Sequence, residues 1–422
     1  MTKGLKNRWL IALSGLGIHA CIGSVYAWSV FSKPLQGVFG CTFKEVQYTF
    51  GLAIFCLGIS AAFMGHVVER RGPKVGGILS AFFWCSGLVG SGIATSDWVD
   101  DPTLKLWGLY LSYGVIGGIG LGTGYVTPVS TLIKWFPDRR GLATGLAIMG
   151  FGFASFLGAP VISELIERWG VSNTFFALAA VYWVVMVASS LYLSPPPQGW
   201  SPVARNQTKL KSHRKTFDLM PMNASEAVRT WPFYGLWTMM FINISCGIAL
   251  ISVASPLIQE MTGVSALAAA AVVGMNGLFN GGGRIIWASV SDWLGRPATF
   301  ICFFLIQIFL FAVLPELHEM LFLQVALYLI MTCYGGGFAT LPAYIGDIFG
   351  TRQVSAIHGY VLTAWALAGV TGSTFAAYIR EATGSYAKML WVFSGIFVIA
   401  LCVSLLLFTF VRRRQRLQVG CP

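Results

Sequence analysis

The chain of 422 residues is 56% hydrophobic and only 10% charged, with a formal net charge of +12. Soluble domains carry about 25% charged residues, so this composition excludes a soluble globular fold and makes a lipid bilayer the expected solvent. The basic excess alone would suggest a nucleic-acid partner, but its distribution along the chain, described below, indicates membrane topology and excludes nucleic acid.

Twelve apolar stretches are long enough to cross a bilayer, which takes roughly 20 residues each. In chain order they lie at 9–31, 46–68, 74–95, 104–133, 141–163 and 174–194, and then, after a polar interval, at 232–255, 266–290, 298–315, 320–346, 354–378 and 388–411. The predicted fold is an all-α membrane protein with twelve transmembrane helices in two six-helix bundles. The first stretch is too long for a signal-peptide core and lacks a small-residue cleavage site, so we expect it in the mature protein.

The basic residues lie mainly in alternate loops between these stretches. They include Lys3, Lys6 and Arg8 near the N-terminus and Arg412, Arg413, Arg414 and Arg416 near the C-terminus. Because positively charged loops stay in the cytoplasm, we expect a multi-pass protein of the cell (inner or plasma) membrane with both termini cytoplasmic.

The polar interval SPPPQGWSPVARNQTKLKSHRKTFDLMPMNASEAVRTW covers 194–231. Its prolines end the preceding helix, and its basic residues place it in the cytoplasm. The predicted domains are an N-terminal bundle at 1–194, a cytoplasmic linker at 195–231, and a C-terminal bundle at 232–422 with a short basic cytoplasmic tail. Two interpretations of 223–230 stay open: part of a flexible tether, or a short interfacial helix.

Motifs for enzymes, metals and cofactors are missing from the sequence. Nine cysteines are scattered without a Cys-x-x-Cys pair, which favours free, packed thiols and no metal site. The glycine-rich run GGIGLGTG (117–124) lacks G-x-G-x-x-G spacing and a preceding strand, so it indicates close helix packing and not a nucleotide loop. We therefore expect neither an enzyme nor a bound cofactor.

The two halves of the chain repeat each other. GHVVERRGPK (65–74) follows the second stretch and ASVSDWLGRP (288–297) follows the eighth; each has an acid, a glycine three residues later and then a basic residue. TPVSTLIKWFPDRRGLATG (127–145) likewise matches LPAYIGDIFGTRQVSAIHG (341–359). Parallel repeats of six spans predict two pseudo-symmetric bundles with a substrate site at their interface near the bilayer midplane.

These segments resemble a known family. The loops at 65–74 and 288–297 resemble the signature of the major facilitator superfamily. KWFPDRRGLATG, NGGGRIIWASVSDWLGR, DIFGTRQVSAIHGYVLTAW and PPPQGW resemble the oxalate/formate antiporter family and the related monocarboxylate transporters. The resemblance runs from Trp9 to about Val411 and implies a transporter that works by alternating access. It also implies that the two loops latch one conformation, through Glu69, Arg70, Asp292 and Arg296.

Arg284 is a permanent charge inside an apolar stretch. It lies eight residues before Asp292 and so about 12 Å into the membrane, whereas all sixteen acidic residues lie in loops or near span ends. A charge at that depth is costly unless it faces water or an anion. It is either a structural arginine bonded to carbonyls of facing helices or an anion-binding residue. The adjacent glycines 281–283, which leave room for a ligand, favour an anion.

Asn280 lies one helical turn before Arg284 on the same face. We expect it to hold the guanidinium or to donate to a substrate oxygen. Many monocarboxylate transporters have an aspartate at this position, with the arginine one turn later. The amide cannot titrate, so it weakens any proton relay that would use a carboxylate here.

Six aromatic residues are candidates for the cavity by resemblance to the family: three tyrosines at its cavity aromatic positions, two phenylalanines at neighbouring aromatic positions, and one tryptophan. They are Tyr26, Tyr125 and Tyr334, whose hydroxyls need partners, together with Phe151, Phe338 and Trp365. For each tyrosine, a hydrogen bond between helices is the alternative to a substrate contact. Trp365 stands where the oxalate-carrying member of the family has a lysine. One cavity cation then suits a monocarboxylate better than a dicarboxylate.

Two histidines have open roles. His19, in the first span, is either a hydrogen-bonded packing residue or a proton carrier, and His358, near the cytoplasmic end of the eleventh, is a candidate gate residue. Because no acid is expected mid-membrane, a coupled proton would travel with the substrate carboxyl or through a histidine.

The expected function is secondary transport of small monocarboxylates such as lactate or pyruvate, coupled to a proton, by a monomer in which Arg284 binds the carboxylate. An oxalate/formate-type anion exchanger is the alternative within transport. A membrane sensor that binds small acids without moving them is the alternative from another class, and it would normally need an output domain.

Overall fold

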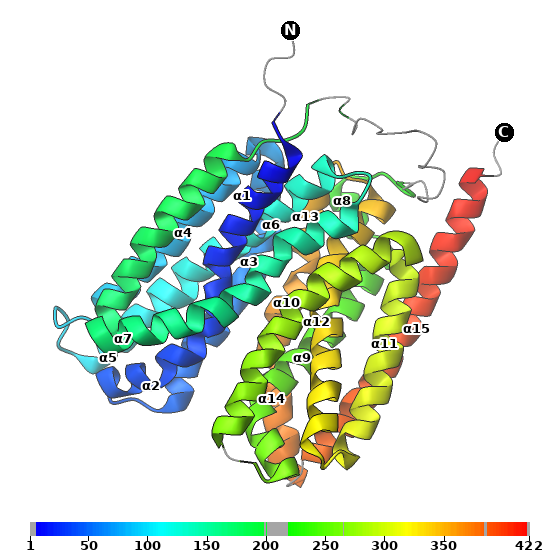
Figure 1. Cartoon of the computed structure of the whole chain (residues 1–422). Coiled ribbons are helices and arrows are strands. Elements are labelled where there is room, and N and C mark those ends of the chain that lie inside the picture. The colour runs from blue at the N-terminus through cyan, green and yellow to red at the C-terminus, as the bar shows by residue number, and fades with distance from the viewer. Residues whose placement is uncertain (1–5, 198–199, 201–217, 265, 384–385, 420–422) are drawn as a thin grey trace. The chain divides into compact units, whose positions relative to one another are not determined.

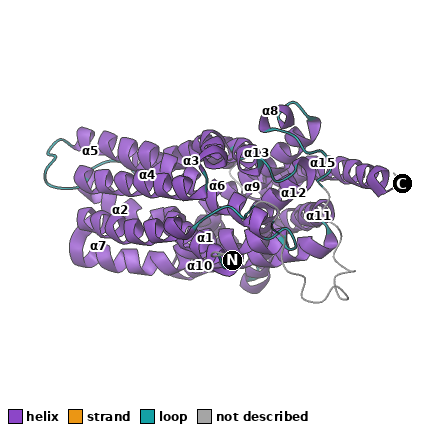
Figure 2. Ribbon diagram, turned by 90° about the horizontal axis from the view of Figure 1, so that it is seen from above, coloured by secondary structure: helices purple, strands orange, loops and turns teal. Residues whose placement is uncertain are grey.

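The computed structural model of the chain describes residues 6–197, 200, 218–264, 266–383 and 386–419. Every regular element in these residues is a helix (Figure 2). The helices form two compact units. Unit 1 comprises Met1–Trp135, Leu146–Gln198 and Ser355–Ala366; unit 2 comprises Phe136–Gly145, Gly199–Val354 and Leu367–Pro422.

The helices are labelled in chain order in Figure 1. Those before the polar interval are α1 (Arg8–Ile22), the 3-10 helix η1 (Gly23–Ala27), α2 (Trp28–Phe39), α3 (Phe43–Arg71), α4 (Pro73–Ala94), α5 (Pro102–Leu109), the π-helical segment η2 (Tyr110–Gly117), α6 (Gly118–Trp135) and α7 (Arg140–Tyr192). Those after its start are α8 (Ala224–Ala227), α9 (Trp231–Thr262), α10 (Ala266–Leu294), α11 (Arg296–Val313), η4 (Leu314–Glu316), α12 (Met320–Phe349), α13 (Val354–Val361), α14 (Thr363–Thr383) and α15 (Tyr386–Val419).

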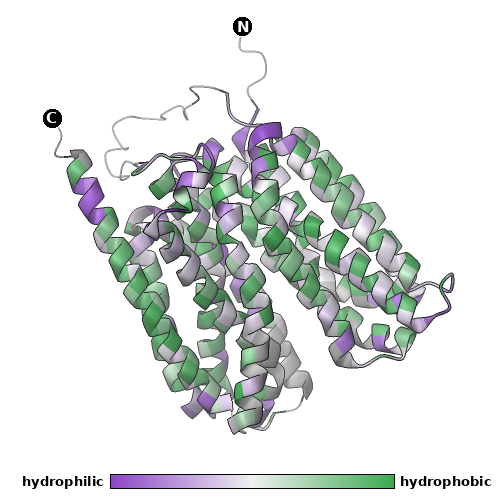
Figure 3. Ribbon diagram, turned by 180° about the vertical axis from the view of Figure 1, so that it is seen from behind, coloured by the Kyte–Doolittle hydropathy of each residue, from purple (hydrophilic) through white to green (hydrophobic). Residues whose placement is uncertain are grey.

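Eleven membrane-spanning candidates lie in the described residues, by length and composition, and they confirm eleven of the twelve predicted stretches. Figure 3 shows hydrophobic residues along the helices and hydrophilic residues mainly at their ends and in loops. The remaining stretch, predicted at 266–290, is the 29-residue helix α10. Asn276, Asn280 and Arg284 lower its hydropathy, so composition alone does not single it out as a span.

Helix α7 joins two stretches that the sequence separated. It runs from Arg140 to Tyr192, and its one break is Gly170, with φ 75° and ψ 171°. Because glycine has no Cβ, it adopts this left-handed backbone without steric cost. The range of α7 therefore contains two helices, which correspond to the fifth and sixth predicted spans and meet at Gly170 without an intervening loop.

The sequence repeat is also a structural repeat. Gly72 ends α3 with φ 85° and Gly295 ends α10 with φ 93°, and a new helix begins directly after each. Pro128 inside α6 and Pro342 inside α12 are a second matching pair. The two acid–glycine loops thus turn the chain in the same way in both halves.

Small residues bring the central helices of each unit together. Helix α6 packs against α1, α3 and α4 in unit 1, and α12 packs against α9, α10 and α11 in unit 2. A Cβ at Gly120 would collide with the backbone nitrogen of Trp84, and one at Gly335 would collide with the carbonyl oxygen of Asn280. The glycines of 117–124 lie in helices, as the packing interpretation predicted.

The predicted linker at 195–231 lies partly outside the described residues, which omit 198–199 and 201–217. Its last part contains α8, a single turn with a capping box in which the backbone N–H of Asn223 donates to Glu226 Oε2 at 2.9 Å. The N–H of Ala224 donates to Gln353 Oε1 at 2.7 Å. A short helix is thus present within 223–230, and it is held to the end of α12 and the turn that follows.

Candidate functional site

Arg284 lies on α10 and has 0% of its surface exposed. Its Nε donates to Oδ1 of Asn280, one turn earlier, at 3.2 Å. Its guanidinium carbon lies 5.2 Å from the centre of the Phe338 ring on α12, which is within cation–π range. Asn280 therefore fixes one edge of the guanidinium and Phe338 covers one face.

The neighbouring helix α12 completes this group. Tyr334 and Phe338 are one turn apart on α12, with ring centres separated by 5.3 Å, and both side chains are buried. Asn280, Arg284, Tyr334 and Phe338 are hereafter the arginine cluster. All four residues were predicted from the sequence, and all four belong to unit 2.

The glycines beside Arg284 have separate roles. A Cβ at Gly283 would collide with the backbone of Thr332 on α12, whereas a Cβ at Gly282 would meet no atom within 4 Å. The expectation that all of these glycines leave room for a ligand is therefore too broad. Gly283 lets α10 approach α12, and Gly282 leaves space.

Six further residues that were predicted for the cavity or for proton binding lie together in unit 1, and Tyr125 is at their centre. The ring of Tyr125 lies 5.4 Å from His19, 5.7 Å from Phe151, 5.8 Å from His358 and 5.3 Å from Trp365, measured between centroids. Tyr26 joins through Phe151, at 4.8 Å. His19, Tyr26, Tyr125, Phe151, His358 and Trp365 are hereafter the aromatic cluster.

The two histidines of this cluster differ in their partners. His19 Nδ1 lies 2.7 Å from the carbonyl oxygen of Ala147, and its Nε2 lies 3.2 Å from the carbonyl oxygen of Tyr125. His358 is buried, and neither of its ring nitrogens has a hydrogen-bond partner among the described residues. His19 therefore contacts the backbone of two neighbouring helices, which is compatible with either of its predicted roles.

The predicted latch residue Glu69 binds two partners that the sequence did not indicate. Its Oε2 accepts from Lys134 Nζ at 2.6 Å, and its Oε1 accepts from the backbone N–H of Ser355 at 3.0 Å and the hydroxyl of Ser355 at 2.7 Å. Ser355 lies in the first turn of α13, where exposed N–H groups attract an anion. Glu69 therefore caps a helix start in unit 1. Arg70 is exposed and has no hydrogen bond or ion pair among the described contacts, so it does not join this group.

The corresponding acid of the second repeat, Asp292, also caps a helix. Its two oxygens accept from the backbone N–H groups of Gly141 at 2.8 Å and Leu142 at 2.9 Å, in the first turn of α7. Arg296 Nη2 donates to Asp292 Oδ1 at 2.5 Å. Asp292 and Arg296 thus form an ion pair, and Asp292 also caps the N-terminus of α7. All of these residues belong to unit 2.

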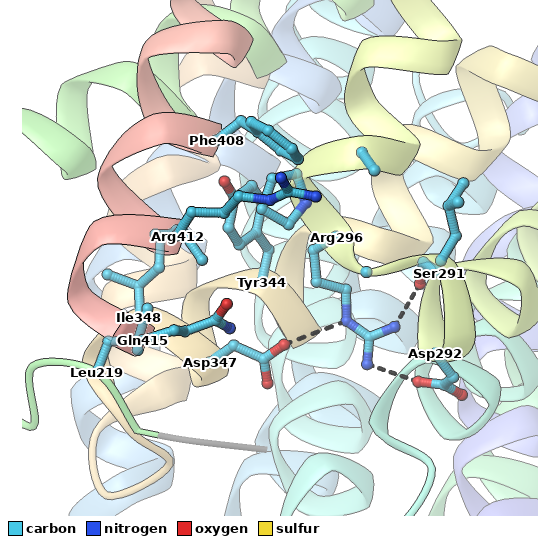
Figure 4. A pocket seen from close by; sticks show the side chains of 15 residues that line it. Leu219, Ser291, Asp292, Arg296, Tyr344, Asp347, Ile348, Phe408, Arg412 and Gln415 are labelled. Carbon is cyan, nitrogen blue, oxygen red and sulfur yellow. Dashed lines mark hydrogen bonds and ion pairs between the residues drawn. The ribbon is translucent and has the colours of Figure 1, made fainter. Parts of the chain in front are cut away.

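Figure 4 shows that Arg296 also reaches a second acid at the wall of a small cavity of about 80 Å³. Its Nε lies 3.4 Å from Asp347 Oδ2 on α12, and its Nη1 donates to Ser291 Oγ at 2.5 Å. Only 4% of the Arg296 side chain is exposed. Asp347, like Lys134 and Ser355, was not predicted, because the sequence shows the repeat of the loops but not the partners that the fold brings to them.

The two caps are reciprocal in the sequence repeat. Glu69, in the first half of the chain, binds Ser355 in the second half, and Asp292, in the second half, binds Gly141 in the first. Gly141 and Ser355 occupy matching positions in the aligned segments 127–145 and 341–359. The two acids that match in the repeat, Glu69 and Asp292, therefore cap two helix starts that also match in the repeat, those of α13 and α7.

Metal chemistry has no support in the part of the chain that the structure describes. No group of three or more His, Cys, Asp or Glu side chains there is placed to hold a metal ion.

Comparisons with known proteins identify the family of the chain. The family model of the Major Facilitator Superfamily matches residues 13–373. The oxalate:formate antiporter of Oxalobacter formigenes is 27% identical over 384 residues, covering 90% of this chain and 87% of the antiporter. Monocarboxylate transporter 12 of Xenopus laevis is 25% identical over 416 residues, covering 92% and 86% of the two chains.

A solved structure, that of the proton:xylose symporter XylE, has a TM-score of 0.71 at 15% sequence identity and covers 96% of both chains. At that identity the likeness concerns the fold alone. The predicted fold class is thereby confirmed. The chain belongs to the major facilitator superfamily, whose members are multi-pass membrane transporters and not enzymes.

Proposed function

We propose that the protein is a secondary transporter of small monocarboxylates, of the size of lactate or pyruvate, and that Arg284 binds the substrate carboxylate. The observation that carries the proposal is a fully buried, permanently charged guanidinium on α10, held at its Nε by Asn280. The family membership supports transport, and the names of two relatives, an oxalate:formate antiporter and a monocarboxylate transporter, support a small organic anion.

The geometry around Arg284 supports an anion over a purely structural role. An arginine fork binds a carboxylate through two parallel N–H groups. Asn280 and Phe338 restrict the orientation of the guanidinium before a substrate arrives, and such preorganisation reduces the entropy lost on binding.

The charge of the substrate follows from the number of permanent cations. The arginine cluster holds one, Arg284. The aromatic cluster holds a tryptophan at 365, the position of a lysine in the oxalate-carrying member of the family, and its remaining polar groups are tyrosines and histidines. A second carboxylate would stay uncompensated at low dielectric constant. The proposed substrate is therefore a monocarboxylate.

The roles of the other predicted residues belong to the same proposal. Tyr334 and Phe338, beside Arg284 in unit 2, contact the short organic part of the substrate and its hydroxyl or keto group, and Tyr26, Tyr125, Phe151 and Trp365 are the candidate substrate contacts within unit 1. The caps made by Glu69 and by Asp292 with Arg296 latch one conformation of the transport cycle. Both termini and these loops face the cytoplasm, where the basic loops place them.

Oxalate/formate-type exchange is the second candidate, favoured by the 27% identity to the antiporter over 90% of this chain. Counterflow in proteoliposomes separates the candidates. Vesicles loaded with unlabelled lactate, pyruvate, formate, oxalate or acetamide are diluted into labelled lactate or labelled oxalate.

The proposal predicts that internal lactate and pyruvate accelerate uptake of labelled lactate, and that oxalate and the uncharged amide do not. Acceleration by oxalate alone would favour the exchanger. Equilibrium binding of lactate with no counterflow would identify a sensor and overturn transport.

A further inference from the structure

The ring of His19 is placed between two acceptors. His19 lies on α1 with 0% of its surface exposed. Its Nδ1 is 2.7 Å from the carbonyl oxygen of Ala147 on α7, and its Nε2 is 3.2 Å from the carbonyl oxygen of Tyr125 on α6. Both distances are those of hydrogen bonds.

Only one protonation state of imidazole satisfies both contacts. A neutral imidazole has one N–H and one lone pair, whereas the imidazolium ion has two N–H groups. A carbonyl oxygen only accepts. In either neutral tautomer, one nitrogen of His19 therefore directs a lone pair at a carbonyl oxygen in a buried place. The protonated ring donates to both.

We propose that His19 is the proton-binding site of this transporter, with the carbonyl groups of Ala147 and Tyr125 as its ligands. This proposal rests on the proposed function and deepens it, because it assigns the coupled proton to a residue of the chain. It also removes the need for a mid-membrane carboxylate, which Asn280 does not provide.

The other titratable groups near His19 do not supply a competing charge. Tyr125 of α6 has a ring contact with His19, Tyr26 of η1 and His358 of α13 belong to the same cluster of rings, and Cys21 lies two residues further along α1. The charged residues of the helices around it lie toward helix ends: Arg8 in the first turn of α1, Lys134 in the last turn of α6, and Glu164, Glu167 and Arg168 close to the break of α7 at Gly170. The tyrosines and cysteines are ordinarily uncharged at neutral pH. His358 lies against the same Tyr125 ring as His19, so a proton on His19 disfavours a second one there. The site binds one proton.

The position of this site links the proton to helix α6. Tyr125 gives its carbonyl to His19 and its ring to the aromatic cluster. Three residues later Pro128 stands inside α6, and a proline lacks the N–H that would complete the helical hydrogen bond to Gly124. Helix α6 is therefore easier to bend at this point. Protonated His19, on α1, donates one hydrogen bond to α6 and one to α7. Release of the proton removes one of these two hydrogen bonds.

The test compares two transport assays on one variant. Counterflow at equal pH exchanges labelled for unlabelled substrate without net proton movement, whereas accumulation driven by an imposed pH gradient requires it. His19→Gln keeps an amide donor and cannot titrate. His318→Gln, in an exposed segment between η4 and α12, is the matched control.

The expected result uses L-lactate as the probe. Wild-type protein and His318→Gln show both counterflow and gradient-driven accumulation. His19→Gln keeps counterflow within about threefold and loses gradient-driven accumulation by about tenfold or more, since only a proton-dependent step is removed. The proposal is overturned if His19→Gln accumulates lactate under a pH gradient as well as the wild-type protein does. It is also overturned if the wild-type protein shows counterflow but no gradient-driven accumulation. Absence of counterflow with any small monocarboxylate instead overturns the proposed function, so the two failures are distinguishable.

A second measurement, on the wild-type protein, tests the proposal even if His19→Gln does not fold. In detergent, addition of saturating L-lactate to the wild-type protein in weak buffer with a pH indicator gives the number of protons bound with the substrate. Nitrogen-15 spectra of labelled histidine then report which ring carries N–H on both nitrogens. The proposal requires a buried histidine, distinct from the exposed ones, in the doubly protonated state. If every buried histidine stays in a neutral tautomer from pH 5 to pH 8, with lactate bound, His19 is not the proton site.

Discussion

Asn280 holds the Nε edge of Arg284 through its amide oxygen, at 3.2 Å. An uncharged partner orients the guanidinium without neutralising it. A carboxylate at the same place would do both, and would then compete with the carboxylate of the substrate.

The first prediction is therefore that Asn280→Asp weakens binding of lactate by about tenfold at neutral pH, since an internal ion pair must be exchanged for the substrate. Binding should recover in acid, where the new side chain is protonated. Thermal stabilisation of the purified protein by lactate, measured at pH 5 and pH 8, checks this. Asn280→Gln, which keeps the amide, is the control. Equal stabilisation of wild type and Asn280→Asp at both pH values would show that position 280 does not influence the ligand.

The second prediction concerns Trp365, fully buried between the rings of Tyr125 and Phe151. Trp365→Lys should improve binding of oxalate relative to lactate, because a second cation is then available for a second carboxylate. Trp365→Phe, which keeps a ring and adds no charge, should not change that ratio. The ratio of the two affinities is the readout, and a ratio that stays constant in Trp365→Lys means that position 365 does not face the substrate.

At this scale the sequence predicted which residues to examine but not their contacts. Arg284 and Asn280 could be paired from helical spacing alone, since one turn separates them. The carbonyl partners of His19 come from helices more than a hundred residues away in the chain, and no local pattern encodes them. Arg70, beside Glu69 in the sequence, makes no contact with it among the described contacts, so its role in the latch stays a prediction.

At the scale of whole helices, the most informative feature is the reciprocal capping of helix starts. Glu69 accepts from Ser355 at the start of α13, and Asp292 accepts from Gly141 and Leu142 at the start of α7. A carboxylate there is favoured by the helix dipole and by direct hydrogen bonds. We expect a variant that breaks either cap to change the balance of conformations and to leave the arginine cluster intact.

The third prediction is that Glu69→Gln and Asp292→Asn lower the turnover of counterflow, while lactate affinity changes by less than about tenfold, because the altered contacts are made in one conformation and not with substrate. Glu167→Gln removes an acid from an exposed position of α7 and serves as the control. Folded Asp292→Asn protein that no longer binds lactate at equilibrium would contradict the latch role.

The fourth prediction tests how α10 is placed against α12. Gly335→Ala brings a Cβ onto the carbonyl oxygen of Asn280, and overpacking of this kind costs about 1–3 kcal/mol. We expect a lower unfolding temperature and weaker lactate binding, since Asn280 orients Arg284. Gly274→Ala, on α10 with no atom within 4 Å of the added carbon, should be neutral or stabilising. If both variants behave like wild type, the close approach of the two helices does not position Arg284.

At the scale of the molecule, hydropathy predicted the spans well because a bilayer imposes length and apolarity on every helix. Helix α10 departs from that rule for a physical reason. It carries Asn276, Asn280 and Arg284 in its middle part. The helix that composition describes least well is the one that holds the candidate anion site, since a binding residue needs a polar group where a span needs an apolar one.

Other features of the fold could not be predicted from local patterns. The fifth and sixth spans are two helices that meet directly at Gly170, within the range of α7, whereas the sequence separates the two stretches by a polar segment. Phe136–Gly145, from the first half of the chain, belongs to unit 2, and Ser355–Ala366, from the second half, belongs to unit 1. These segments match each other in the sequence repeat, yet their assignment depends on contacts between distant parts of the chain.

The binding of the carboxylate by Arg284 is tested most directly by ligand-induced thermal stabilisation of purified Arg284 variants, with lactate and its uncharged amide as ligands. We predict that Arg284→Lys, which keeps the charge but loses the planar fork, weakens stabilisation by lactate by about tenfold or more, a loss of roughly 1.4 kcal/mol. We predict that Arg284→Gln abolishes stabilisation by lactate and leaves the weak effect of lactamide unchanged. Circular dichroism and size-exclusion chromatography establish that both variants are folded. Folded Arg284→Gln that is stabilised by lactate at the same concentrations as wild type would show that another group binds the carboxylate.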